Sequence, residues 1–130
     1  MQNEKYYKGL FFVGAIWNWI ISVALFFGRE PMLKFLGMKP PVYIVPFQMA
    51  MVLVFVFGIA YFYVYKDLIG NKVCAKIGVY SKVAIFFVLS YYWITGEILF
   101  VMVIPGIVDV IFAILFLEFL FRVKREKKYK

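Results

Sequence analysis

The sequence predicts an all-α integral membrane protein in which four transmembrane helices form an antiparallel bundle. Three observations support this fold class. Hydrophobic residues make up 65% of the 130 residues and charged residues only 17%, whereas a soluble domain is about 45 to 50% apolar. Four apolar runs of roughly 20 residues follow one another, and each is long enough to cross about 30 Å of hydrocarbon as a helix. Most basic residues lie at or near the ends of these runs.

The four runs form one transmembrane domain that covers residues 1–130. The expected helices cover about 9–27, 42–65, 73–94 and 98–121, and a basic cytoplasmic tail follows over 122–130. The first run is too long for the apolar part of a secretory signal and does not end in a small-residue cleavage site. We therefore expect it to remain attached as a span.

The connections between the runs differ in length. Those near 65–72 and 95–97 are short, so the helices that they join must be antiparallel neighbours. The first connection, 28–41, contains Pro31 and Gly37, which favour the start and the end of a short helix. Its apolar residues predict one or two helical turns in the membrane interface, and an irregular surface loop is the alternative.

Lysine and arginine are unequally divided between the two ends of the predicted bundle. Eleven, including Lys76 near the start of the third run, lie at the end that carries residues 1–8, the connection near 66–72 and the tail 122–130. Three lie in the connection 28–41, and Lys82 lies inside a span. Basic residues are in excess on the cytoplasmic side of membrane proteins. We therefore expect a multi-pass protein of the bacterial cytoplasmic (inner) membrane with both termini in the cytoplasm.

The remaining composition limits the function. The net charge of +8 does not indicate nucleic-acid binding, because no folded basic face with base-reading side chains is predicted; the tail is expected to attract anionic membrane lipids instead. The chain has no histidine, and Cys74 is its single cysteine, so common haem and zinc ligand sets and thiol pairs are not available within it. With no catalytic motif, the sequence favours a non-enzymatic role without a cofactor or a metal.

Four polar residues interrupt the apolar runs, where a bilayer makes them expensive. They are Asn18, Gln48, Lys82 and Asp109. Each falls on a stripe with spacings of three and four residues, which is typical of a bundle-facing side. The stripes are Phe11, Gly14, Ala15, Asn18, Ser22 and Leu25; Gln48, Met51, Phe55, Gly58, Phe62 and Tyr65; Ala75, Gly78, Lys82, Ile85, Leu89 and Tyr92; and Met102, Pro105, Asp109, Phe112, Phe116 and Phe119.

The two intramembrane charges lie at similar depths. At 1.5 Å per residue, Lys82 is about 14 Å and Asp109 about 18 Å from the same end of the bundle. An unpaired charge at the bilayer centre costs at least about 2.5 to 3.5 kcal/mol, so we expect an ion pair. The alternative has Lys82 reaching the cytoplasmic interface and Asp109 bonded to Asn18 or water. Nearer the tail, Glu118 is expected to meet Arg122 one turn later.

Polar groups and aromatic rings together predict a ligand site in the bundle interior. Its candidate residues are Asn18, Gln48, Tyr61, Lys82, Asp109 and Phe112, with Phe55 and Phe116 as further rings. A lipid-like or quinone-like molecule would place its headgroup on the polar groups and its apolar part on the rings. A partner membrane subunit is another occupant, and the sequence is compatible with either a monomer or a homodimer. A purely structural subunit and a small proton-coupled transporter that uses Asp109 are the alternative functions.

A family resemblance covers nearly the whole chain. Its residues are Gly14, Asn18, Pro31, Leu36-Gly37, Phe47-Gln48, Phe57-Gly58-Ile59-Ala60-Tyr61, Asn71, Gly78, Lys82, Asp109, Phe112-Ala113 and Phe116. In this order they resemble small four-helix bacterial membrane proteins of the DoxX-like kind. The resemblance implies a four-helix membrane fold and, as in some relatives, association with oxidoreductases or with quinone-linked sulfur oxidation. The lack of histidine and of paired cysteines departs from what independent redox catalysis needs.

Overall fold

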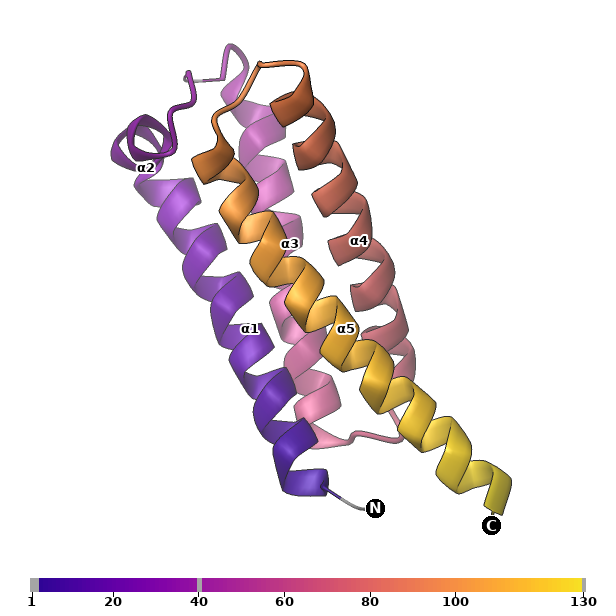
Figure 1. Ribbon diagram of the computed structural model, residues 1–130. Coiled ribbons are helices and arrows are strands. Elements are labelled where there is room, and N and C mark those ends of the chain that lie inside the picture. Colours follow the sequence, from indigo (N-terminus) through magenta and orange to yellow (C-terminus); the bar gives the residue numbers. More distant parts are fainter. Residues whose placement is uncertain (1–2, 40, 130) are drawn as a thin grey trace.

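A computed structural model describes residues 3–39 and 41–129. Within these ranges the chain forms five helices and no strand, namely α1 (Glu4–Phe27), α2 (Arg29–Phe35), α3 (Ile44–Lys66), α4 (Lys72–Ile94) and α5 (Phe100–Tyr129). Of these described helices, all except α2 are long and apolar enough to cross a membrane. The four long helices lie side by side, as Figure 1 shows. The prediction of an all-helical chain with four long apolar helices is confirmed.

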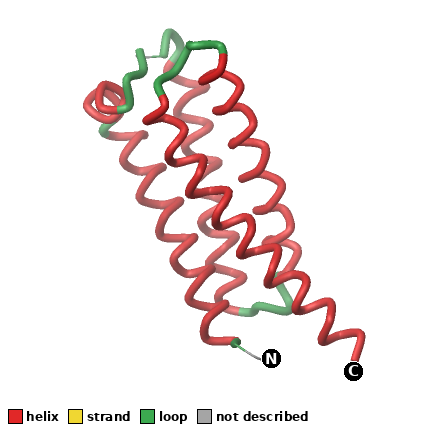
Figure 2. The backbone as a smooth tube through the Cα atoms, viewed as in Figure 1, coloured by secondary structure: helices red, strands yellow, loops and turns green. Residues whose placement is uncertain are grey.

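The connections lie at the two ends of the bundle (Figure 2). One end, here called the basic end, carries the start of α1, the α3–α4 connection and the last turns of α5 (Figure 1). The opposite end, the α2 end, carries α2 and the α4–α5 connection. Basic residues placed at the basic end include Lys5, Lys8, Lys66, Lys72, Lys76, Arg122, Lys124 and Arg125.

The helix boundaries differ from the expected ones mainly at the basic end. α1 begins at Glu4 rather than near residue 9, and α5 continues to Tyr129 rather than ending near 121. The expected limits followed the loss of apolar residues, but lysine, arginine and glutamate are good helix formers. The expected short helix in the first connection is present as α2, with Pro31 in its first turn, and Gly37 follows it with a φ of 73°.

The long helices associate as two pairs, α1 with α3 and α4 with α5, and the contacts between the pairs are fewer. Gly58 allows α1 to approach α3 closely. A Cβ at this position would lie 2.5 Å from the Trp19 Nε1 atom and 3.2 Å from the Ala15 carbonyl oxygen. All six residues of the stripe predicted for the first helix, from Phe11 to Leu25, are buried.

The buried core has two parts. At the basic end, aromatic rings fill the space between the helices, and Phe11 stacks on Phe116 with ring centroids 4.4 Å apart. At the α2 end, Leu25, Leu33 and Leu36 form a smaller cluster that packs α2 against α1. The polar residues Asn18 and Lys82 are also buried.

Burial on α3 and α4 is limited to the halves nearest their connection. The buried residues are Gly58, Tyr61 and Val64 on α3, and Ala75, Gly78, Val79 and Lys82 on α4. The stripes predicted for these helices were therefore wrong in their other halves, where Phe55, Ile85 and Tyr92 are exposed. A straight stripe assumes that neighbouring helices cover a helix along its whole length, and in these halves no residue of α3 or α4 is buried.

The stripe on α5 is also shifted at the α2 end. Val103 and Gly106 are buried there, whereas Met102 and Pro105 are half-buried. Farther along, Phe116 and Phe119 are fully buried as predicted. The helix continues through Pro105.

Candidate functional site

Lys82 and Asp109 form an ion pair near the middle of α4 and α5. The Lys82 Nζ atom lies 2.7 Å from the Asp109 Oδ1 atom, and the side chains are 4% and 19% exposed, respectively. The expected pair is thus confirmed. Lys82 does not extend to the basic end, so the alternative placement is wrong.

Asn18 connects the ion pair to the other two long helices. Lys82 Nζ donates to the Asn18 side-chain oxygen at 3.3 Å. The Asn18 amide nitrogen in turn donates to the backbone carbonyl of Val54 on α3 at 3.2 Å. The small residues Gly14 and Ala15, one turn earlier on the same side of α1, keep this side of the helix close to its neighbours.

Trp17 completes the site, although the sequence interpretation did not select it. Its indole N–H donates to Asp109 Oδ1 at 3.3 Å, so one carboxylate oxygen accepts from both Trp17 and Lys82. A signal was present in the sequence, because an indole N–H usually finds an acceptor when it is buried. Asp109 is the carboxylate that lies at about the same depth in the bundle as Trp17.

Two aromatic rings flank the Lys82 ammonium group. Its nitrogen lies 5.3 Å from the Tyr61 ring centroid and 5.4 Å from that of Phe112. Cations placed over aromatic rings at such distances are attracted by the ring quadrupole. The Tyr61 hydroxyl itself is buried and has no hydrogen-bond partner within the described residues.

These six residues, Trp17, Asn18, Tyr61, Lys82, Asp109 and Phe112, are called the charged cluster below. Five of them were candidate site residues, and Gln48 is the candidate that lies elsewhere. Gln48 is half-buried on the first turns of α3 and forms no hydrogen bond in the described part of the chain. It is six residues from Val54, which corresponds to about 9 Å along a helix and explains its separation from Asn18.

The charged cluster retains unused hydrogen-bonding capacity. Asp109 Oδ2 makes no hydrogen bond within residues 3–39 and 41–129, and the Lys82 ammonium group uses two of its three donors on Asp109 and Asn18. A carbonyl or hydroxyl group approaching this point would find both an acceptor and a donor. In the described ranges no group of three or more cysteine, aspartate or glutamate side chains is arranged to hold a metal ion.

A comparison with protein-family models found no match to this chain, and neither did searches of curated proteins and of solved structures.

Proposed function

We propose that the chain is a multi-pass protein of the bacterial inner membrane, with α1, α3, α4 and α5 as its spans. The length and apolar composition of these helices support the proposal. The excess of lysine and arginine at the basic end supports a cytoplasmic location for both termini. In this orientation α2 lies at the outer interface. Recovery of the chain in carbonate-washed membranes tests the proposal, and its release into the soluble fraction would contradict it.

Within this membrane bundle, we propose that the charged cluster binds the polar head of an apolar molecule of the lipid or quinone class. One observation carries the proposal: Asp109 keeps 19% of its side chain exposed and one oxygen free of hydrogen bonds in the described chain, although its partner Lys82 is 4% exposed. A pair that only joins helices is expected to be closed on both sides. The open side of Asp109 instead offers an acceptor to a headgroup.

The helices beside the cluster supply apolar surface for the rest of such a molecule. From Gly58 toward the α2 end of α3, and from Lys82 toward that end of α4, no further residue is buried. The side chains there are mostly apolar and exposed or half-buried, as Phe55 and Phe86 illustrate. The hydrocarbon chain of the ligand would pack against these apolar side chains, and its polar head would lie at the charged cluster.

A purely architectural role is the second candidate, and a specific observation favours it. The hydrogen bonds of Trp17, Asn18, Lys82 and Asp109 involve α1, α3, α4 and α5, so the cluster joins all four long helices. Buried polar groups of this kind specify which helices become neighbours. In this role the cluster would bind nothing.

Native mass spectrometry of the detergent-purified protein separates the two candidates. The wild-type chain is compared with the double variant Lys82→Met/Asp109→Leu, which keeps the approximate side-chain volumes but removes the charges. We expect a lipid or quinone mass on the wild type, retained in several detergents, and its loss from the double variant. A wild type without any bound molecule in every detergent would contradict ligand binding and leave the architectural role.

Membership of the DoxX-like group is also a proposal, and it rests on the residue pattern between Gly14 and Phe116. On this basis a quinone is the first molecule to look for. Chromatography of organic extracts from the purified protein distinguishes a quinone from a phospholipid. If only a phospholipid is found, the proposal of ligand binding stands, but the bound molecule gives no support to the family assignment.

A further inference from the structure

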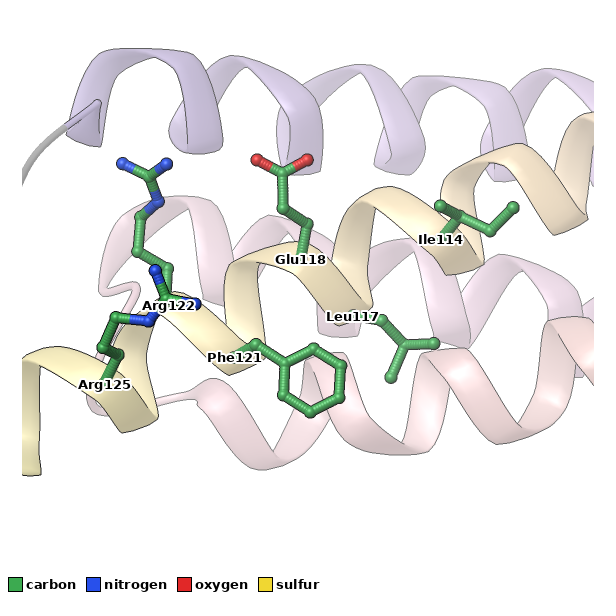
Figure 3. A pocket seen from close by; sticks show the side chains of 6 residues that line it. All are labelled: Ile114, Leu117, Glu118, Phe121, Arg122 and Arg125. Atoms are coloured by element: carbon green, nitrogen blue, oxygen red, sulfur yellow. The ribbon is translucent and has the colours of Figure 1, made fainter.

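A groove of about 600 Å³ runs along α5 at the basic end, beyond the charged cluster (Figure 3). It is separate from the proposed headgroup site, because Asp109 does not line it. The residues that line it all belong to α5 and are Ile114, Leu117, Glu118, Phe121, Arg122 and Arg125.

The lining residues form two adjacent stripes of different chemistry. Ile114, Leu117 and Phe121 are spaced by three and four residues, and all three are exposed. The second stripe consists of Glu118, Arg122 and Arg125 and is displaced by about one turn toward the C-terminus. An amphipathic molecule lying along the groove would therefore meet apolar side chains first and guanidinium groups at its end.

Among the side chains that the structure describes, no carboxylate forms an ion pair with either arginine of this groove. The expected contact between Glu118 and Arg122 is absent, because both residues turn to Tyr7: the phenol donates to Glu118 Oε1 at 3.1 Å, and the Arg122 guanidinium lies 5.9 Å from the ring centroid. Neither arginine forms an ion pair within the described ranges. Two guanidinium groups are thus available at the polar end of an exposed apolar stripe.

We propose that this groove binds an anionic phospholipid of the cytoplasmic leaflet, with its phosphate on Arg122 and Arg125 and one acyl chain along the apolar stripe. Guanidinium groups bind phosphate through paired, directional hydrogen bonds, and basic pockets on the cytoplasmic side of membrane helices hold anionic headgroups. The site rests on the proposed membrane orientation, which places the basic end in that leaflet.

The dimensions and the remaining polar residue agree with this occupant. From Ile114 to Phe121 the helix rises about 10 Å, which fits within the hydrocarbon half of one leaflet, about 15 Å thick. The Glu118 carboxylate would repel a phosphate at its own level, so the phosphate lies toward the C-terminus.

The test uses the full chain purified in a neutral detergent and titrated with phosphatidylglycerol or phosphatidylcholine, with native mass spectrometry as the readout. Wild type is expected to bind phosphatidylglycerol in preference to phosphatidylcholine. The variant Arg122→Gln/Arg125→Gln is expected to bind phosphatidylglycerol about 30-fold more weakly, from roughly 1 kcal/mol per basic residue. The control Lys76→Gln/Lys124→Gln removes the same charge outside the groove and is expected to bind within about twofold of wild type, because those charges act only through a screened potential.

Several outcomes would overturn the site. Equal weakening in both double variants would mean that net charge alone attracts the lipid, and competition by inorganic phosphate at equal concentration would mean that the acyl chain contributes nothing. Because Arg122 contacts Tyr7, Arg125→Gln is tested alone as a variant that leaves this contact in place, and wild-type binding by it would also contradict the proposal. A protein that binds as expected in detergent but is not recovered in membranes would contradict the membrane proposal instead.

Discussion

The ring of Tyr61 occupies the space that a side chain at position 78 would need. A Cβ added to Gly78 would lie 2.5 Å from Tyr61 Cε1 and 2.9 Å from its hydroxyl oxygen. The same ring lies beside the Lys82 ammonium group, 5.3 Å from centroid to nitrogen. Gly78 therefore sets the position of one wall of the charged cluster, although it has no side chain of its own.

Replacing Gly78 by alanine is expected to destabilise the protein by about 1 to 3 kcal/mol, because overpacking forces Tyr61 or the α4 backbone to move. Thermal unfolding in detergent measures the change. Gly9→Ala is the matched control, since nothing lies within 4 Å of the added Cβ, and it is expected to stabilise α1 by about 0.5 to 1 kcal/mol through helix propensity. Equal stabilities of the two variants would show that Tyr61 does not fill this space.

Much of the fold was predictable because two local rules govern it. A bilayer requires about 20 apolar residues per span, which identified four long helices, and a buried side of a helix repeats every three or four residues. The second rule identified the buried side of α1 from Phe11 to Leu25. It was wrong for Phe55 and Ile85, which are exposed, because burial also depends on which part of a helix its neighbours cover, and no single stripe contains that information.

The charged cluster was predictable to a similar extent. Depth and the energetic cost of a lone charge predicted the Lys82–Asp109 pair, and the structure contains it. Gln48 was selected on polarity alone, and its position on the first turns of α3 separates it from the cluster. Trp17 was missed because it is not on the stripe of Asn18, yet its N–H reaches Asp109 across to α5.

Trp17 is expected to stabilise the site through its hydrogen bond to Asp109. Trp17→Phe keeps an aromatic ring and removes the donor, so we expect a loss of about 1 kcal/mol in the free energy of unfolding. Trp93→Phe is the control, because Trp93 is exposed and contacts Phe100 through its ring. Chemical unfolding in mixed micelles measures both variants, and a loss in Trp93→Phe as large as in Trp17→Phe would contradict a specific role for the hydrogen bond.

The proposed orientation predicts which exposed positions react from outside the cell. In a Cys74→Ala background, cysteines are placed at Lys34 on α2 and at Lys124 on α5, both exposed. A membrane-impermeant maleimide applied to intact spheroplasts is expected to label position 34 and to leave position 124 unlabelled until the membrane is broken, because basic residues concentrate on the cytoplasmic side. The reverse pattern would invert the orientation, and labelling of both positions in intact spheroplasts would contradict four spans.

The ion pair itself is tested by a double-mutant cycle on thermal stability in detergent. Asp109→Ala leaves the Lys82 ammonium group inside the bundle without its carboxylate, which is expected to cost about 3 to 5 kcal/mol, reduced if the lysine side chain reaches the interface. Lys82→Met/Asp109→Leu is expected to recover much of this loss, because desolvation cancels most of the attraction within a buried pair. A coupling energy indistinguishable from zero would show that the two charges do not stabilise one another. Recovery of stability together with loss of the bound lipid or quinone would place the pair in ligand binding rather than in architecture alone.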